Sequence, residues 1–471
     1  MKKNIIGREK EKALLERIFH SSKSEFVSVC GRRRVGKTFL VKEFFENELV
    51  FQTAGLANDR MSRQIKSFYE DLIEFGLPHQ PVAPKDWIDI FSLLRELIKQ
   101  SDQERKVILL DELPWMDTPR SGFMSALEHF WNSWASGRHD IVLVVCGSAT
   151  SWMMDKLINN HGGLHNRLTY QLFLEPFTLR ESEQFLQSRG FNLSRYDIAV
   201  NYMIMGGIPY YLDMLDDRLS LAQNIDELLF RPNGLLTREF SNLYAALFNN
   251  SDDYIKVIEA LSKKKSGMNR SEIIKATSLQ SGNGLTMILK NLEWCGFIRK
   301  YKNYKAARND NTLYQLIDFF TLFYFHFLAE KGKSNWNGIQ GTPAFYSWAG
   351  LTFELLALCH IDQIKQKLGI SGISSSEYAW RSDKTGPGAQ IDLVIDRADN
   401  TINLCEMKFS VGIYTIDNNN EMNLRNKLAR FMSSAEKRKS IQLTFVTTYG
   451  VERNAHSGIV NNEVVLDDLF N

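Results

Sequence analysis

The stretch "SVCGRRRVGKTFL", residues 28–40, decides the fold of the first part of the chain. Four of its positions match the Walker A spacing G-x-x-x-x-G-K-[ST]: Gly31, Gly36, Lys37 and Thr38. A β-prone run, residues 26–30, precedes them, and a stretch with apolar residues at helical spacing, residues 38–45, follows them. The glycines therefore fall in a strand-to-helix turn, where backbone N–H groups and a helix N-terminus converge on an anion.

The pattern gives these positions distinct roles toward ATP and its Mg²⁺. The glycines let the backbone approach phosphate closely, Lys37 pairs with the β and γ phosphates, and Thr38 ligates Mg²⁺. The variable positions complete the expected nucleotide-binding loop: Arg32, Arg33, Arg34 and Val35. The three arginines receive no separate role. The alternative interpretation is a solvated basic turn.

A second buried strand supplies the acidic partner that a Walker A loop needs. The stretch "KVILLDELPWMD", residues 106–117, contains a continuous apolar run that ends in Asp111 and Glu112. Such runs are typical of parallel strands buried on both faces, and ligands gather at the carboxyl ends of these strands. We expect Asp111 to hold Mg²⁺ through water and Glu112 to polarise the attacking water as general base. The alternative is a pair of solvent-exposed acids.

Two further polar residues lie next to strand-like runs. Ser148 follows "IVLVVC" and can orient the hydrolytic water or touch the γ-phosphate, or it can cap a helix that starts near Ala149. Arg167 precedes "LTYQLFLEPF" and could serve as an arginine finger, from its own subunit or from a neighbour in a homo-oligomer. The alternative for Arg167 is an ordinary surface arginine.

The bulk composition is that of a globular chain of about three domains. The residues are 44% hydrophobic and 24% charged, and a net charge of +2 leaves any nucleic-acid surface to a local patch. The five cysteines are scattered and form no C-x-x-C pair, which indicates buried thiols in a reducing compartment. No apolar run reaches 18 residues, so the sequence predicts a cytoplasmic protein without a membrane partner.

Six stretches follow one another in a characteristic order: "NIIGREKEKALLERIF", "GRRRVGKT", "ILLDELPWM", "VVCGSATSWM", "NRLTYQLFLEPF" and "GGIPYYL". Together they resemble the archaeal-type ATPases, which are AAA+-related P-loop proteins of the STAND group, many with a nuclease-like C-terminal domain. The resemblance covers nearly the whole chain. It implies that Gly7-Arg8-Glu9 packs beside the nucleotide and that Gly207-x-Pro209 lies in a helical lid that senses it. From spacing alone, Gly206, Gly207 and Pro209 predict only a helix break.

The predicted fold class is α/β. The sequence patterns and the family resemblance together divide the chain into four parts. These are a P-loop ATPase domain with an AAA+-like parallel sheet (1–177), a helical lid (178–252), a winged helix-turn-helix (253–312) and a restriction-endonuclease-like α/β domain (313–471). Thr178 with Glu181 three residues later predicts the start of the first lid helix.

A basic stretch, "RKYKNYKAAR", follows the three helices expected for the winged helix-turn-helix. As a wing it could lie against DNA phosphates through five residues: Arg299, Lys300, Lys302, Lys305 and Arg308. The alternative is a solvated hairpin in a domain that only braces its neighbours within the chain.

A hairpin is predicted in "AQIDLVIDRADNTINLCEMKFS", residues 389–410, around a turn at residues 397–401. If the turn is centred on Asp399, Asp392 lies opposite Glu406, and Lys408 shares the face of Glu406. Like charges directly opposite one another are destabilising. A divalent cation between the two carboxylates would remove that cost.

This arrangement resembles the PD-(D/E)XK nuclease core. The resemblance implies that Asp392 and Glu406 bind Mg²⁺ or Mn²⁺ and that Lys408 lies near the scissile phosphate or the attacking water. It also implies that Glu354, in the helix-patterned "AGLTFELLALCH", is an additional metal-binding acid. The first element is Gln390-Ile391-Asp392 rather than Pro-Asp, a departure that bears on catalytic competence.

Two functions are compatible with these patterns. In the first, ATP binding and hydrolysis switch a C-terminal metal-dependent nuclease that acts on nucleic acid, with DNA the expected substrate. In the second, the ATPase is a regulatory or DNA-binding module, and the nuclease-like domain is a non-catalytic scaffold. The two differ only in the last domain, so cleavage in the presence of Mg²⁺ or Mn²⁺ distinguishes them.

Overall fold

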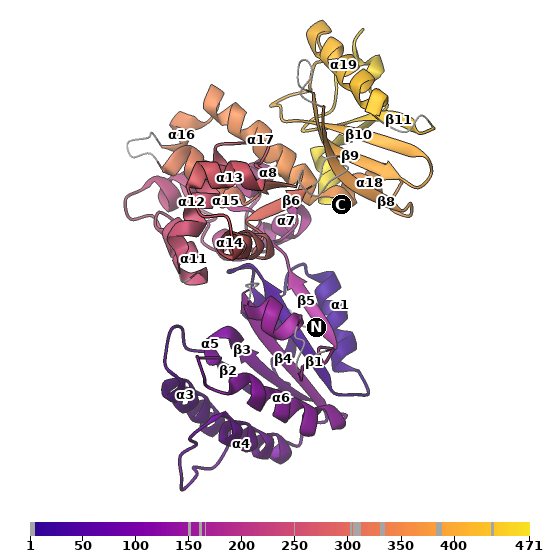
Figure 1. Cartoon of the computed structure of the whole chain (residues 1–471). Helices are drawn as coiled ribbons and strands as arrows, with labels where there is room; N and C mark the ends of the chain where they lie inside the picture. The colour runs from indigo at the N-terminus through magenta and orange to yellow at the C-terminus, as the bar shows by residue number, and fades with distance from the viewer. Residues whose placement is uncertain are drawn as a thin grey trace. The chain divides into compact units, whose positions relative to one another are not determined.

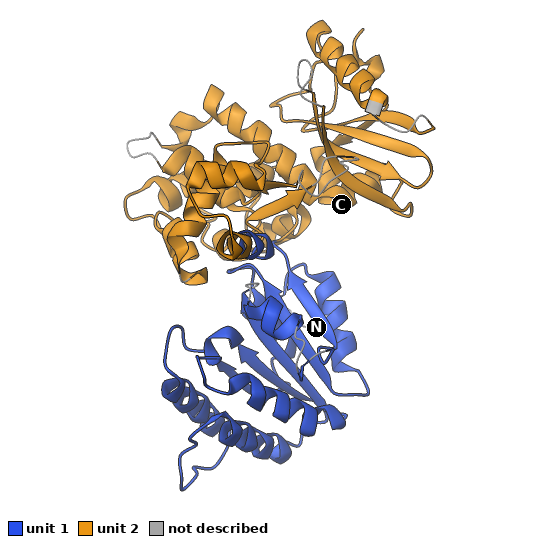
Figure 2. Cartoon of the chain, viewed as in Figure 1, with its two compact units in different colours: residues 1–176, 289–295 blue, residues 177–288, 296–471 orange. Residues whose placement is uncertain are grey.

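The computed structural model describes residues 5–471 apart from 149–151, 160–162, 165, 249, 302–303, 305–311, 330–334, 383–388 and 435–437. Figure 1 shows the helices and strands along the chain. The chain divides into two compact units (Figure 2). Unit 1 comprises residues 1–176 and 289–295, and unit 2 comprises residues 177–288 and 296–471.

Unit 1 is built on a parallel sheet. Its strands are β1 (Glu25–Gly31), β2 (Leu49–Ala54), β3 (Lys106–Asp111), β4 (Ile141–Ser148) and β5 (Tyr170–Leu174). In the described part of the chain the strand order is β2-β3-β4-β1-β5, and each neighbouring pair is parallel. The strands β1, β3 and β4 are buried along nearly their whole length, which explains their continuous apolar sequences. The predicted parallel sheet is confirmed.

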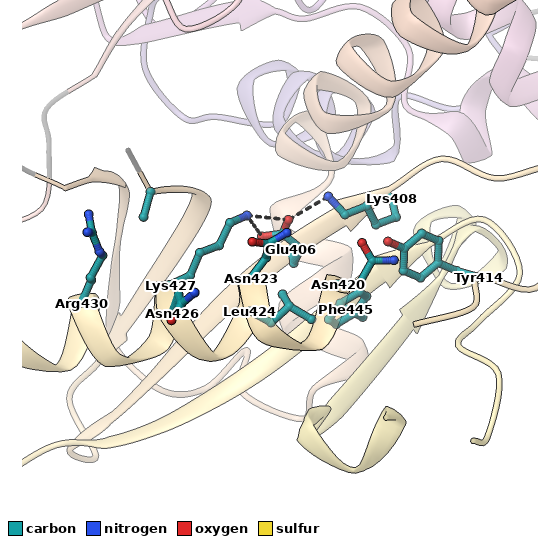
Figure 3. Close-up of a pocket in the computed structure, with 11 residues that line it drawn as sticks. Glu406, Lys408, Tyr414, Asn420, Asn423, Leu424, Asn426, Lys427, Arg430 and Phe445 are labelled. Atoms are coloured by element: carbon teal, nitrogen blue, oxygen red, sulfur yellow. Dashed lines mark hydrogen bonds and ion pairs between the residues drawn. The ribbon is translucent and has the colours of Figure 1, made fainter. Parts of the chain in front are cut away.

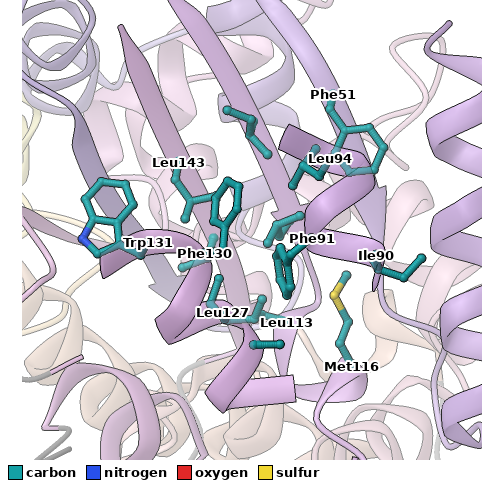
Figure 4. Close-up of a cluster of buried hydrophobic side chains, with 14 of the residues drawn as sticks. Phe51, Ile90, Phe91, Leu94, Leu113, Met116, Leu127, Phe130, Trp131 and Leu143 are labelled. Carbon is teal, nitrogen blue, oxygen red and sulfur yellow. The ribbon is translucent and has the colours of Figure 1, made fainter. Parts of the chain in front are cut away.

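Helices flank this sheet and complete the core of unit 1. They are α1 (Glu9–Phe19), α2 (Lys37–Phe45), α3 (Met61–Glu74), α4 (Trp87–Gln100), α5 (Leu113–Met116) and α6 (Phe123–Ser133), with the short η1 (Ala135–Gly137) and η2 (Trp152–Ile158). Phe91 and Leu94 of α4 and Phe130 of α6 pack with Leu143 of β4 in one buried cluster (Figure 4). Burial of each such side chain stabilises the fold by about 2 kcal/mol.

Unit 2 begins with helices, as predicted for residues 178–252. They are α7 (Leu179–Ser188), α8 (Arg195–Met205), α9 (Pro209–Leu212), α10 (Leu221–Ile225), η3 (Asp226–Phe230) and α11 (Glu239–Leu247). Thr178 and Glu181 form the predicted capping box at the start of α7. The predicted helix break is also confirmed, because α8 ends at Met205, its C-cap Gly206 has φ 71°, and Pro209 opens α9.

Three helices and an antiparallel strand pair follow in the described part of residues 251–316. They are α12 (Ser251–Ser262), α13 (Arg270–Thr277), α14 (Asn283–Trp294), β6 (Ile298–Tyr301) and β7 (Leu313–Leu316). The pair β6–β7 is in register with Ile298 opposite Leu316. Residues 289–295 of this segment group with unit 1.

A helical layer and a mixed sheet complete unit 2. The helices are α15 (Phe319–Phe323), η5 (Tyr324–Leu328), α16 (Trp336–Ile339), α17 (Pro343–Cys359), α18 (Ile361–Lys367) and α19 (Asn418–Ser434), with η6 (Ser457–Ile459) and η7 (Leu466–Phe470). The strands are β8 (Ser375–Arg381), β9 (Gln390–Arg397), β10 (Thr401–Lys408), β11 (Ser440–Thr447) and β12 (Asn462–Val465). Their order in the described part is β12-β11-β10-β9-β8, with β8, β9 and β10 antiparallel and β10, β11 and β12 parallel.

The hairpin β9–β10 has the predicted register. Cys405 pairs with Leu393, and Ile402 pairs with Asp396. The same register, extended by one residue, sets Asp392 opposite Glu406. Centring the turn on Asp399 was therefore sufficient to predict the pairing.

The cysteines agree with the sequence prediction of buried thiols. Cys30, Cys146, Cys295 and Cys405 are free and buried, whereas Cys359 is free and exposed. Among the described residues, no single helix is both long and apolar enough to cross a membrane, and α17 with α18 meets that test only as a pair bent by 73°.

Candidate functional site

The loop between β1 and α2 has the backbone geometry of a phosphate cradle. Gly31 has φ 155°, and a Cβ atom there would lie 2.4 Å from the carbonyl oxygen of Leu174, so only glycine fits. Gly36, with φ 89°, is the N-cap of α2. The Lys37 ammonium donates to the carbonyl oxygens of Gly31 at 3.2 Å and Arg32 at 3.0 Å. These bonds hold the ammonium against the loop, where it is ready to meet phosphate.

The predicted Mg²⁺ ligands meet at the carboxyl ends of β1 and β3. The Thr38 hydroxyl donates to Asp111 Oδ2 at 2.6 Å, and Asp111 is buried. A hydroxyl and a carboxylate are hard oxygen ligands of the kind that Mg²⁺ prefers. The two residues therefore fit the predicted Mg²⁺ site.

Glu112 follows β3 directly and is partly buried. Its backbone is left-handed, with φ 47°, and its N–H donates to Asp111 Oδ1 at 2.9 Å. Burial raises the pKa of Glu112, and the nearby Lys37 ammonium opposes this shift only in part. A carboxylate with a raised pKa accepts a proton more readily, which suits a general base.

The remaining predicted residues of this site are distributed around the loop. Ser148 ends β4 and pairs in register with Gly31, so both residues lie at the carboxyl ends of their strands. The proposed helix start near Ala149 lies outside the described residues. Arg8 is buried and donates to the carbonyl oxygen of Val35 at 3.3 Å, so it contacts the loop, and the packing of Gly7-Arg8-Glu9 beside the nucleotide stays a prediction. Arg32 is buried, Arg33 is exposed, and Arg34 is partly buried with φ 73°.

Arg167 does not lie near the loop of its own chain. It is exposed in the turn before β5, and Thr169 bonds to Phe26 at the start of β1. Arg167 precedes β5, which is parallel to β1, so it lies at the amino ends of these strands. Gly31 lies at the carboxyl end of β1. The seven residues of β1 span roughly 20 Å. The prediction of a finger from its own subunit is therefore wrong, and a finger from a neighbouring subunit stays a prediction.

A second group of charged residues gathers on the hairpin of unit 2. Glu406 is buried, and the Lys408 ammonium donates to its Oε1 at 2.8 Å. Burial raises the pKa of Asp392, and the charge of Glu406 adds to that rise. Burial also acts to raise the pKa of Glu406, but the ammonium groups of Lys408 and Lys427 outweigh it, and the pKa is lowered. The two carboxyl groups of the pair are therefore shifted in opposite directions, with the pKa of Asp392 raised and that of Glu406 lowered.

The structure adds a lysine that the sequence analysis did not identify. Lys427 of α19 donates to both carboxylate oxygens of Glu406, at 2.8 and 2.9 Å (Figure 3). It lies between Leu424 and Phe431, which are buried and belong to the apolar face of α19. A lysine on the inward face of an amphipathic helix was the sequence signal that could have revealed it.

Glu354 lies in helix α17, as predicted, and is paired with a lysine. Its Oε1 accepts from Lys265 at 2.6 Å. Burial, followed by the charge of Asp392, raises the pKa of Glu354 to about 7. Within the described residues, no group of three or more His, Cys, Asp or Glu side chains is arranged to hold a metal ion. The predicted three-acid set of Glu354, Asp392 and Glu406 is thus not arranged as one metal-binding group among the described residues, and lysines pair with Glu354 and Glu406.

The candidate wing is described only in part. Lys302, Lys305 and Arg308 lie outside the described residues. Lys300 is exposed on β6. Arg299 is partly buried, and its Nε donates to Gln315 Oε1 of the partner strand at 2.8 Å, so its contact with phosphate stays a prediction. Burial lowers the pKa of Arg299, as expected for a cation that faces the interior.

Comparisons with known proteins bear on the first part of the chain. Residues 5–215 match the family described as "ATPase domain predominantly from Archaea". The chain carries an archaeal-type ATPase domain. The phosphate cradle, Asp111 and Glu112 all lie inside this domain.

Two proteins of Methanocaldococcus jannaschii are similar to the chain. MJECL04 is 25% identical over 365 residues, which are 75% of this chain and 76% of that protein. The ATP-binding protein MJ0423 is 42% identical over 46 residues, which are 10% of this chain and 78% of that protein. The Walker-type ATPase PAby2304 of Pyrococcus abyssi is 18% identical, with a TM-score of 0.53, over 68% of this chain and 96% of that structure, and shares the fold.

Proposed function

We propose that the chain is an ATP-hydrolysing switch whose C-terminal part is a metal-dependent nuclease acting on nucleic acid, with DNA the expected substrate. The contact of 2.6 Å between Thr38 and Asp111 carries the first half of this proposal. It joins the phosphate loop to the acidic end of β3, and the archaeal-type ATPase domain supports it. Bound Mg²⁺ would neutralise charge on the phosphates.

The residues of the loop have separable roles in this proposal. Lys37 would move from the carbonyl oxygens of Gly31 and Arg32 to the β and γ phosphates of ATP. Glu112 would accept the proton of the attacking water. Burial of Glu112 raises its pKa and so strengthens it as a base.

We expect the variants Lys37→Ala and Glu112→Gln to separate binding from hydrolysis. Lys37→Ala removes the phosphate contact and should lose ATP binding, whereas Glu112→Gln should bind ATP–Mg²⁺ and fail to release phosphate. Equilibrium dialysis and phosphate release measure the two steps. Equal ATP affinity in Lys37→Ala and the unaltered chain would contradict the assignment.

The register of β9 and β10 supports the nuclease half. Two opposed carboxylates, Asp392 and Glu406, supply hard oxygen ligands, and Lys408 is bonded to Glu406 on the same face. A bound Mg²⁺ or Mn²⁺ would polarise a phosphodiester and a water molecule. Helices α12–α14 followed by the antiparallel pair β6–β7 support the winged helix-turn-helix assignment for the preceding segment.

The decisive variant for this half is Asp392→Asn, which keeps the shape of the side chain and removes one ligand charge. It should abolish Mn²⁺-dependent cleavage of plasmid and single-stranded DNA and leave ATP hydrolysis intact. If Asp392→Asn instead raises the thermal stability and changes no activity, the two carboxylates only repel each other, and the nuclease half is wrong.

One observation favours a second candidate, in which the C-terminal part is a non-catalytic scaffold of a regulatory ATPase. Lys427 bonds to both oxygens of Glu406, where a cation would otherwise bind. A permanent Lys427–Glu406 pair would keep the divalent cation out. Absence of Mn²⁺ binding to the full chain by calorimetry would support this candidate.

A further inference from the structure

A pocket lies between the end of β10 and helix α19. Its volume is about 480 Å³, in the range of pockets that hold organic ligands. Most of the lining comes from β10, from the segment that follows it, and from one face of α19, and Phe445 of β11 and Ala389 complete it (Figure 3). The pocket includes Glu406 and reaches Arg430, two turns along α19 from Asn423.

The charge of the lining suits a phosphodiester backbone. Among the described residues that line the pocket, Lys408, Lys427 and Arg430 are basic, and Glu406 is acidic. Figure 3 shows Lys427 and Arg430 rising from successive turns of α19 on the same side. The two residues are three positions apart, which is a rise of about 4.5 Å along the helix, and side chains at this spacing are neighbours on one helix face. The two side chains can therefore contact neighbouring phosphates.

The uncharged part of the lining suits bases. Tyr414 is partly exposed at one end of the pocket and lies near Asn420 (Figure 3). Asn423 and Asn426, also of α19, add exposed amides that both donate and accept hydrogen bonds. Aromatic rings beside a basic groove bind single strands, because a base offers its face for stacking only when it is not enclosed in a duplex.

We propose that this pocket binds a single strand of nucleic acid, with phosphates on Lys427 and Arg430 and a base against Tyr414. The inference rests on the proposed function in taking nucleic acid as the substrate, and it deepens that function by naming the strand state and the contact residues. Lys427 then has two partners: it holds Glu406 in the empty pocket and turns to phosphate when a strand enters.

The test measures binding without cleavage. The full chain is titrated in EDTA against fluorescein-labelled oligothymidylate of about 16 nucleotides, and the fluorescence anisotropy is recorded. The variants are Arg430→Ala and Tyr414→Leu. Arg425→Ala is the matched control, because Arg425 is a basic residue of the same helix that pairs with Glu421 and does not line the pocket.

We expect Arg430→Ala to weaken binding about tenfold, because a charge-assisted hydrogen bond to phosphate is lost. The slope of log affinity against log salt should flatten by about 0.7. Tyr414→Leu should weaken binding about fivefold or more through lost stacking. Arg425→Ala should change the affinity less than about twofold. Equal losses in Arg430→Ala and Arg425→Ala, or tighter binding of the matching duplex, would overturn the proposal.

Binding and cleavage measurements test the pocket assignment and the nuclease assignment separately. If Arg430→Ala binds normally while Asp392→Asn abolishes Mn²⁺-dependent cleavage, the pocket assignment is wrong and the nuclease assignment stands. If Arg430→Ala weakens binding while no Mn²⁺-dependent cleavage occurs, the pocket assignment stands and the nuclease assignment is wrong.

Discussion

Lysines whose ammonium groups are already held in place occupy both candidate sites. Lys37 is bonded to two carbonyl oxygens of its own loop, and Lys408 and Lys427 are bonded to Glu406. A buried cation needs such partners, because desolvation otherwise costs several kcal/mol. The partners differ in chemistry: Lys37 is bonded to neutral carbonyl oxygens, whereas Lys408 and Lys427 are bonded to a buried carboxylate, which holds a cation more strongly.

The backbone of Gly31 lies so close to Leu174 that it leaves no room for a Cβ atom. We expect Gly31→Ala to lower the free energy of unfolding of unit 1 by on the order of 3 kcal/mol, because the new Cβ would meet a backbone oxygen at 2.4 Å and the chain would have to shift. Urea unfolding followed by tryptophan fluorescence measures this loss. Gly137→Ala is the control, since a Cβ there meets nothing within 4 Å. Equal stability of both variants would contradict the close approach of β1 and β5.

Helices and strands were predictable from the sequence to different degrees. The parallel strands of unit 1 followed from continuous apolar runs, because strands buried on both faces have such sequences. The register of β9–β10 followed from the turn signal at residues 397–401, because the centre of the turn sets which residues lie opposite each other. The position of Arg167 could not be predicted, because it depends on whether β5 runs parallel or antiparallel to β1. The sequence does not give that direction, and in the structure the two strands are parallel. Lys427 was missed because its contact with Glu406 joins residues 21 positions apart in different elements.

His360 joins two helical segments of unit 2 and gives them a pH-dependent contact. The N–H of Leu179, at the start of α7, donates to His360 Nε2 at 3.0 Å, so the ring proton is on Nδ1, which donates to the carbonyl oxygen of Leu356 at 2.8 Å. Burial lowers the pKa of His360 from 6.5 to about 4. A protonated ring has no lone pair for Leu179, so the contact requires the neutral form.

We expect the stability of unit 2 to fall as the pH drops below about 6.5, because His360 then binds a proton in the unfolded chain and not in the folded one. The contribution lost between pH 6.5 and 4 is on the order of 3 kcal/mol. Urea unfolding at about pH 7.5 and 5 should detect about 2 kcal/mol of this loss. The His360→Gln variant should be less stable at the higher pH and depend less on pH. The exposed His326 provides the control variant His326→Gln, and equal pH dependence in both variants would contradict the assignment.

At the scale of the whole molecule, the two candidate sites belong to different compact units. The phosphate cradle lies in unit 1, and the carboxylate pair and the α19 pocket lie in unit 2. The chain passes between the units more than once, because residues 289–295 group with unit 1 while their neighbours on both sides belong to unit 2. A nucleotide-dependent change in unit 1 therefore has more than one covalent connection through which to act on unit 2.

If ATP switches the second unit, the two sites must be linked in both directions. Glu112→Gln allows the linkage to be measured at equilibrium, because it should hold ATP–Mg²⁺ without hydrolysis. We expect ATP to change the affinity of this variant for single-stranded DNA by about 5- to 150-fold, and DNA to change its affinity for ATP by the same factor. Anisotropy titrations of labelled DNA with and without ATP, and of labelled ATP with and without DNA, give the two factors.

The controls for this linkage address each site separately. The double variant Lys37→Ala, Glu112→Gln should bind DNA as Glu112→Gln does without nucleotide, whether or not ATP is added. The double variant Arg430→Ala, Glu112→Gln should bind ATP normally and lose most of its response to DNA at the same DNA concentration. Because binding free energies around a closed cycle sum to zero, unequal factors would mean that the titrations are not at equilibrium. Two factors of one would mean that the ATPase domain does not control the pocket, and the switch in the proposed function would be wrong.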